Sequence, residues 1–162
     1  MLLKLNNTIY NATINDNGTI TLVYENTEVE TYKYKLSVST PTDCVPLIQK
    51  IANKQQEHFM VIALNSAHQI IKSKVIFKGT VNYCLVHNRD IFNFLIKNNA
   101  TSFIIAHNHP SNSLNPSEQD IKITKEVLKA SKIMGINLLD HIIITKDGFY
   151  SFCEKTNNFN DF

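Results

Sequence analysis

The feature that most constrains the fold is the order of apolar and amphipathic segments after Pro41. Short runs rich in Val, Ile and Phe alternate there with longer segments of helical period. Helices are predicted at 41–56, 88–99 and 117–134, and strands at 58–65, 69–79, 102–106, 138–145 and 149–154. The order α-β-β-α-β-α-β-β predicts an α/β (α+β) fold, in which a mixed central β-sheet is flanked by helices.

The first 38 residues have a different composition, rich in Thr, Tyr, Val and Asn, with period-2 alternation typical of strands. The dipeptide Asn17-Gly18 lies between two such runs and is a strong hairpin signal. We therefore predict a small N-terminal β-hairpin extension at 1–38, a main domain at 39–155 and a loose tail at 156–162.

Composition excludes several classes of protein. The net charge of +2 is too weak to indicate nucleic-acid binding, although it leaves a local basic patch open. No segment reaches the roughly 18–20 apolar residues that span a bilayer, and the N-terminus does not resemble a signal sequence. The three cysteines lack metal or redox spacing, so we expect reduced thiols in a cytoplasmic protein without membrane association. Nothing in the sequence indicates an oligomeric state.

The residues that suggest chemistry follow the predicted strand at 102–106. His107 and His109 are two residues apart at the end of that strand, so their side chains point to the same face. Pro110 ends the strand, and Asp120 lies in the first turn of the next helix. Two imidazole nitrogens and one carboxylate oxygen suit a three-ligand zinc site that leaves a fourth position for water.

Simpler explanations exist for each of these residues. A histidine pair at a strand end is often just a pair of polar side chains on the surface, and Ser117 with Asp120 has the spacing of a helix capping box. Capping accounts for Ser117 and Asp120 but not for the two histidines. The two roles of Asp120 are compatible, because each carboxylate oxygen can serve a different partner.

The pattern His107-Asn108-His109-Pro110, six residues, Ser117, two residues, Asp120 resembles the RadC branch of the JAB/MPN (JAMM) metalloprotein family. The segments HNRDIF and INLLDHIII also resemble that family, and the likeness covers residues 38–153. Asn112 stands where the family usually has glycine, and Asn88 where it has proline. Asparagine tolerates left-handed backbone, so we expect the loop at Asn112 to keep its shape.

The resemblance implies the cytidine-deaminase-like architecture of JAB/MPN domains and a Zn²⁺ ion held by His107, His109 and Asp120. It further implies that Glu57 is the general base and that Ser117 stabilises an oxyanion. The implied function is a zinc-dependent hydrolase of metallopeptidase or isopeptidase type, which uses a metal-activated water on an amide bond of a peptide or protein substrate. Without the resemblance, Glu57 reads as a solvated residue at a helix–strand junction.

Two alternatives stay open at the sequence level. One is a non-catalytic MPN-like binding module, and the other is a RadC-type protein acting in DNA repair or other DNA transactions. The near-neutral charge, and a sequence without the helix-hairpin-helix region of longer RadC proteins, weigh against the second. The pair Asp140-His141 either supports the metal site from behind or forms a satisfied pair within the sheet, and the second interpretation is preferred.

Overall fold

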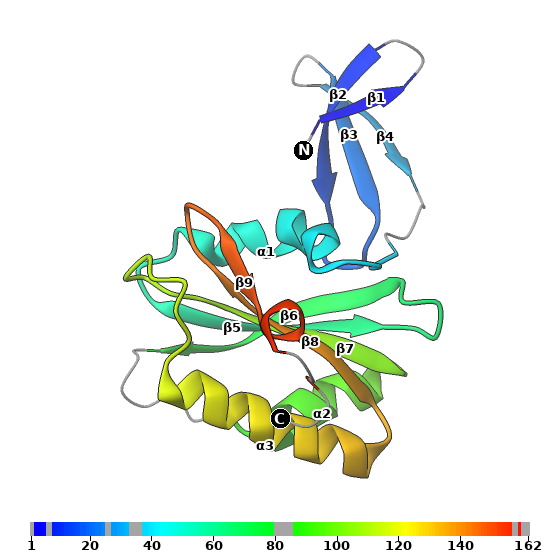
Figure 1. The fold of residues 1–162 in the computed structure, drawn as a ribbon. Helices are drawn as coiled ribbons and strands as arrows, with labels where there is room; N and C mark the ends of the chain where they lie inside the picture. The colour runs from blue at the N-terminus through cyan, green and yellow to red at the C-terminus, as the bar shows by residue number, and fades with distance from the viewer. Residues whose placement is uncertain are drawn as a thin grey trace.

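A five-stranded sheet forms the centre of the molecule in a computed structural model that describes residues 2–5, 8–24, 27–32, 37–79, 86–156 and 159 (Figure 1). The strand order is β6-β5-β7-β8-β9. β7 and β8 are parallel, and the other neighbours are antiparallel. The strands are β5 (Glu57–Leu64), β6 (Ile70–Gly79), β7 (Ser102–Asn108), β8 (Asn137–Ile144) and β9 (Phe149–Ser151).

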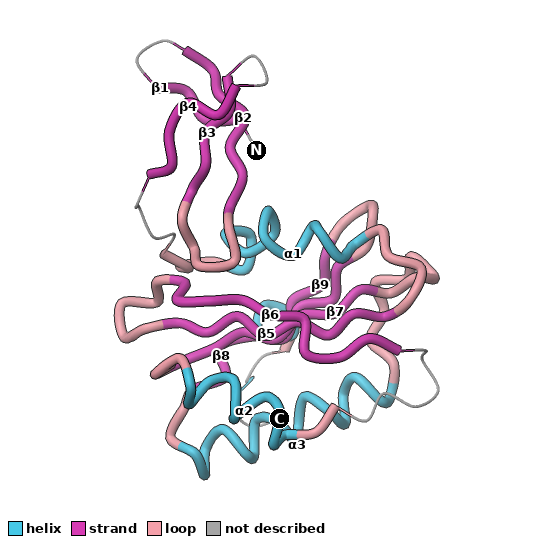
Figure 2. The backbone as a smooth tube through the Cα atoms, turned by 180° about the vertical axis from the view of Figure 1, so that it is seen from behind, coloured by secondary structure: helices cyan, strands magenta, loops and turns pink. Residues whose placement is uncertain are grey.

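Helices cover both faces of this sheet, as Figure 2 shows from behind. α1 (Val45–Ala52) lies on one face, and α2 (Asn88–Lys97) and α3 (Glu118–Met134) lie on the other. Each face has its own buried apolar cluster, one that includes α1 residues and one that includes α2 and α3 residues. The predicted mixed sheet flanked by helices is thus confirmed. None of the helices in the described part of the chain is both long and apolar enough to cross a membrane.

Alternation along β7 decides where the first histidine points. Phe103 and Ile105 pack in the α2–α3 cluster, whereas Ile104 and Ala106 pack in the α1 cluster. His107 continues the first series and therefore faces α3. Because β7 and β8 are parallel and α3 connects them, α3 begins near the carboxyl end of β7.

The N-terminal region is larger than the predicted hairpin. It forms a four-stranded antiparallel sheet of order β1-β2-β3-β4, which projects beyond α1 (Figure 1). The predicted Asn17-Gly18 turn joins the two central strands, and an additional strand pairs on each outer edge. The strands are β1 (Leu2–Leu5), β2 (Thr8–Ile14), β3 (Ile20–Tyr24) and β4 (Thr27–Tyr32).

The turn between β2 and β3 anchors this sheet to the main domain. The Asp16 carboxylate accepts a hydrogen bond from Ser73 Oγ (2.9 Å) and pairs with Lys50. Burial alone would raise the pKa of Asp16, but the bonds from Lys50 and Ser73 outweigh it and lower that pKa. Gly18, at φ 78°, lies so close to β6 that an added Cβ would be 2.6 Å from the Ile70 carbonyl oxygen.

Two predicted elements are corrected near the C-terminus. The strand predicted at 149–154 ends at Ser151, where a short helix, α4 (Phe152–Lys155), begins. Ser151 Oγ accepts from Glu154 N, and Asp140 accepts from Cys153 N, so helix capping prevails over the strand pattern. In the tail predicted to be loose, Phe159 is buried in the α2–α3 cluster, and residues 157–158 and 160–162 lie outside the described residues.

The first predicted helix, at 41–56, is shorter and starts differently. It begins as the 3₁₀ turn η1 (Pro41–Cys44), continues as α1 and ends at Ala52. Thr40 is the N-cap of η1, and the Asp43 carboxylate accepts from the backbone N–H groups of Ser39 and Thr40.

Replacing Gly18 by alanine should loosen the N-terminal sheet. The left-handed backbone alone costs roughly 1–2 kcal/mol for a residue with a Cβ, and the contact with the Ile70 carbonyl adds to this cost. Gly135→Ala is the matched control, because Gly135 has φ 65° and no atom within 4 Å of an added Cβ. Amide hydrogen exchange of residues 11–23 should accelerate in Gly18→Ala and stay unchanged in Gly135→Ala. Equal exchange in wild type and Gly18→Ala would contradict the anchoring role.

Candidate metal centre

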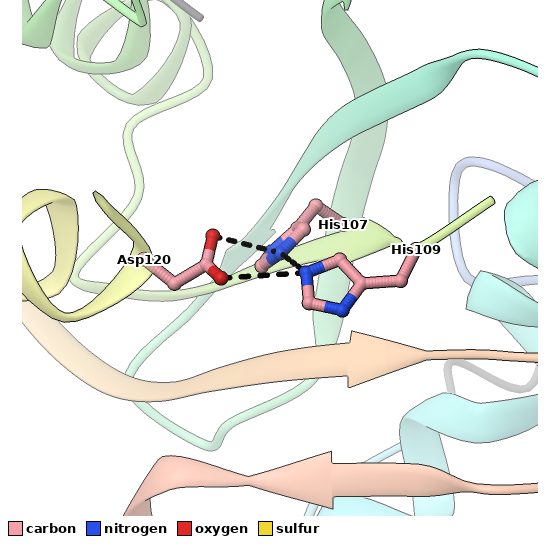
Figure 3. A group of neighbouring side chains, drawn as sticks. All are labelled: His107, His109 and Asp120. Atoms are coloured by element: carbon pink, nitrogen blue, oxygen red, sulfur yellow. Dashed lines mark hydrogen bonds and ion pairs between the residues drawn. The ribbon is translucent and has the colours of Figure 1, made fainter. Parts of the chain in front are cut away.

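Three side chains converge at the junction between β7 and α3 (Figure 3). His107 Nε2 lies 3.0 Å from Asp120 Oδ1, and His109 Nε2 lies 3.3 Å from Asp120 Oδ2. The two Nε2 atoms are 3.0 Å apart. All three residues are largely buried, so two imidazole nitrogens and a carboxylate face one another away from bulk water.

The chain holds each of these residues by local structure. His107 is the penultimate residue of β7, and His109 lies just beyond the strand, where its N–H donates to the Ile144 carbonyl of β8 (3.3 Å). Asp120 is the third residue of α3, and Ser117 is the N-cap of that helix. The strand end and the helix start therefore bring the three side chains together.

Asp120 serves the helix cap and the cluster at once. Its Oδ2 accepts from Ser117 N (2.7 Å) and Ser117 Oγ (2.6 Å), while its own N–H donates to Ser117 Oγ (3.2 Å). Burial alone would raise the pKa of Asp120, but the bonds from His107, His109 and Ser117 hold it well below its usual range. The carboxylate is therefore ionised at any pH near neutral.

The geometry fits a small divalent cation. Ligands placed tetrahedrally at about 2.0–2.1 Å from zinc are about 3.3 Å from one another, close to the separations in this cluster. Each Nδ1 atom already has a partner, His141 Nε2 for His107 (2.8 Å) and the Ser113 carbonyl for His109 (2.7 Å). Both Nε2 atoms thus point to the shared centre, as metal-binding histidines usually do.

The pKa of His109 reflects this environment. Burial alone would lower it, but the bonds to Asp120 and to the Ser113 carbonyl outweigh burial and raise it. The Asp120 carboxylate that would help to hold a cation therefore also favours a proton on His109.

The preferred interpretation of Asp140-His141 as a pair within the sheet is wrong for His141. Adjacent residues of a strand face opposite sides, so His141 lies beside His107, while Asp140 accepts from Ser151 Oγ (2.6 Å) on the other face. Burial raises the pKa of Asp140 to about 6 and lowers that of His141 well below its usual value. The second nitrogen of His141 contacts Thr124 Oγ1 (2.6 Å).

Glu57 lies at the start of β5, next to the cluster. Seven side chains line a cavity of about 20 Å³ here: Glu57, Phe59, His107, Ser117, Gln119, Asp120 and Ile123. Glu57 and Ser117 therefore line the same cavity as His107 and Asp120. Burial raises the pKa of Glu57, and the positive field of His107 and His109 only partly offsets this effect.

Asn108, a residue that the sequence pattern does not mark as important, ties the segment leading into β5 to the end of β7. Its side chain is fully buried and points away from the histidines on either side. Asn108 Oδ1 accepts from His58 N (2.8 Å), and its Nδ2 donates to the carbonyls of Lys54 and Gln56 (both 3.2 Å). These bonds flank Glu57 on both sides and fix its backbone relative to the histidines.

The loop between His109 and Ser117 has a left-handed residue at Asn112, where the resembling family usually has glycine. Asn112 has a left-handed φ of 62°, as predicted. Its side chain also accepts from Lys146 N (3.1 Å) and donates to Asp147, so it links the loop to the turn between β8 and β9. A glycine could adopt this backbone but could not make the link.

Comparison with known proteins gives matches over most of the chain. A family model described as a RadC-like JAB domain matches residues 38–158. A UPF0758 protein of Streptococcus uberis is 42% identical over 113 residues, which are 70% of this chain and 50% of that protein. A UPF0758 protein of Staphylococcus epidermidis is 40% identical over 121 residues, which are 74% of this chain and 54% of that protein. One of Bacillus mycoides is 39% identical over 125 residues, which are 76% of this chain and 56% of that protein.

The chain spans about half the length of the curated relatives it matches. The matched region contains both histidines, Asp120 and Glu57. The family model covers most of the chain. The relatives are well above 30% identical to it over more than two thirds of its length. The chain therefore belongs to the family of proteins with a RadC-like JAB domain.

Proposed function

We propose that this protein is a zinc-dependent hydrolase that cleaves an amide bond in a peptide or protein substrate. The observation that carries the proposal is the convergence of His107, His109 and Asp120 beside a half-buried glutamate, Glu57. A metal centre with a free acidic side chain at its edge has the parts that hydrolysis requires.

Zinc suits the donor set of two imidazole nitrogens and one carboxylate oxygen, which recurs in zinc hydrolases. When bound, zinc would supply Lewis acidity, which acidifies water and polarises a carbonyl group. The three side chains would hold the ion, and the contacts of His107 and His109 through their Nδ1 atoms would fix the ring orientations.

Glu57 is the proposed general base. It would accept a proton from the attacking water at the cavity and pass that proton to the leaving amine. Burial raises the pKa of Glu57 towards neutral pH, so the protonated carboxyl would hold the proton long enough to give it to the leaving amine. The bonds that Asn108 makes on either side keep Glu57 at this edge.

Ser117 is the proposed donor to the oxyanion. A serine hydroxyl has one proton, and here Ser117 Oγ directs it to Asp120 Oδ2 at 2.6 Å. To stabilise an oxyanion, the hydroxyl must turn this proton towards the substrate. Asp120 would keep the backbone N–H of Ser117, at 2.7 Å, as its capping partner.

The cavity has room for a water-sized group but not for a peptide, because its volume is only about 20 Å³. A substrate would therefore lie across its mouth and present one carbonyl group to it. This favours an extended peptide or isopeptide segment over a compact small molecule.

A non-catalytic binding module is the main competing function. The three ligand residues and Glu57 are all present and close together, whereas a scaffold has no need to keep a proton acceptor at the cavity. Action on DNA has no comparable support, since the net charge of the chain is only +2.

Glu57→Gln should slow hydrolysis by orders of magnitude while leaving zinc bound. Loss of a general base typically costs about 10²–10⁴-fold in rate, and Glu57 is not one of the three converging ligands. Cleavage of a proteome-derived peptide library, with and without isopeptide-linked members, would be followed by mass spectrometry. Zinc content would be measured in the same samples.

Two controls accompany this test. A chelator should remove the activity of the wild type, and His109→Ala should lose both zinc and activity. Stoichiometric zinc with no cleavage of any peptide or isopeptide by the wild type would favour the binding module. Cleavage that Glu57→Gln leaves unchanged would contradict the role of Glu57 as the base.

Zinc affinity should rise with pH up to the raised pKa of His109. Zinc binds neutral imidazole, so below that pKa a proton must leave, and affinity changes by about tenfold per pH unit for each displaced proton. Asp120 does not contribute in this range, because its pKa is lowered. Competition with a chelator at pH 5.5, 6.5 and 7.5 measures this trend, and constant affinity over the range would argue against binding at His109.

A further inference from the structure

Behind the metal centre, away from the cavity, a chain of hydrogen bonds connects His107 back to Asp120. His107 Nδ1 lies 2.8 Å from His141 Nε2, and His141 Nδ1 lies 2.6 Å from Thr124 Oγ1. Thr124 Oγ1 in turn donates to the backbone carbonyl of Asp120 at 2.6 Å. The chain joins β7, β8 and α3 and ends on a residue whose side chain is itself a candidate ligand.

These groups are held in place by packing. His141 and Thr124 are fully buried. The His141 ring stacks on Phe152, with centroids 4.8 Å apart and an interplanar angle of 7°. The Phe59 ring lies next to the same ring, with the two centroids 6.0 Å apart. Neither nitrogen of His141 can therefore turn to another partner or to water.

A cation at the centre dictates where the protons lie. His107 must offer the lone pair of Nε2, so its proton is on Nδ1 and is donated to His141 Nε2. His141 then carries its proton on Nδ1 and needs an acceptor there. Thr124 Oγ1 is that acceptor, and its single proton stays on the Asp120 carbonyl. In this arrangement, every donor in the series of hydrogen bonds from His107 to the Asp120 carbonyl has one acceptor.

We propose that Thr124, acting through His141, is a positioning residue that sets the metal-binding tautomer of His107. Without the hydroxyl, that tautomer would leave a buried N–H of His141 without an acceptor, which is unfavourable. The opposite tautomer of His141 would place a proton between the two rings and turn the His107 lone pair away from the centre. The hydroxyl at position 124 thus favours the ligand arrangement from a site that touches neither metal nor substrate.

The inference rests on the proposed metal centre, and a matched pair of variants tests it. Thr124→Val keeps the shape but removes the hydroxyl, and Thr124→Ser keeps the hydroxyl but removes a methyl group from a fully buried site. We expect Thr124→Val to bind zinc about 10–100-fold more weakly, as is usual when the hydrogen-bond partner of a metal-binding histidine is lost. Thr124→Ser should stay within about threefold of wild type. A role in packing alone predicts the reverse order, because the serine variant packs less well.

Zinc affinity would be measured by chelator competition, and thermal unfolding would show that both variants are folded. Nitrogen-15 NMR of the zinc-loaded wild type should show His107 and His141 both protonated at Nδ1. Equal zinc affinity of wild type and Thr124→Val, or a proton on Nε2 of His141 in the loaded protein, would overturn the inference and leave the proposed function standing. A wild type that binds no zinc would overturn both.

Discussion

The contact of the Asp120 carboxylate with two imidazole rings is the interaction on which the rest of the site depends. It requires the end of β7 and the start of α3 to be held a few ångströms apart, and the cap made by Ser117 achieves this for the helix. The same carboxylate that starts the helix therefore completes the cluster. Stability of the fold and assembly of the site are linked through one side chain.

Burying two histidines and an aspartate is costly unless their polar atoms are satisfied. Each has partners, which come from Ser117 for the carboxylate, the Ser113 carbonyl for His109, and His141 for His107. Among the described residues, the buried side-chain N or O atom without a partner is Ser102 Oγ, outside the cluster. The three side chains are thus held together as one cluster, which could hold a cation between the facing nitrogens and the carboxylate.

Much of this arrangement could be predicted from the sequence, because spacing determines it. The spacing of His107 and His109 predicts a shared face, and the structure brings the two rings together although His109 lies just beyond β7. The central sheet follows from the order of apolar segments. Thr124 and Asn108 could not be found in this way, since their roles depend on contacts with residues distant in the chain. Both are polar residues that the fold buries completely, which the sequence alone does not reveal. The last strand was predicted too long because a local cap at Ser151 competes with the alternating pattern.

The most direct test of the central claim is a crystal structure of the zinc-loaded protein, with anomalous scattering measured at the zinc edge. The account predicts a single strong site, with zinc about 2.0–2.2 Å from Nε2 of His107, Nε2 of His109 and one carboxylate oxygen of Asp120. Zinc bound elsewhere, or an Asp120 carboxylate that keeps only its contacts with Ser117 and does not reach the metal, would contradict it.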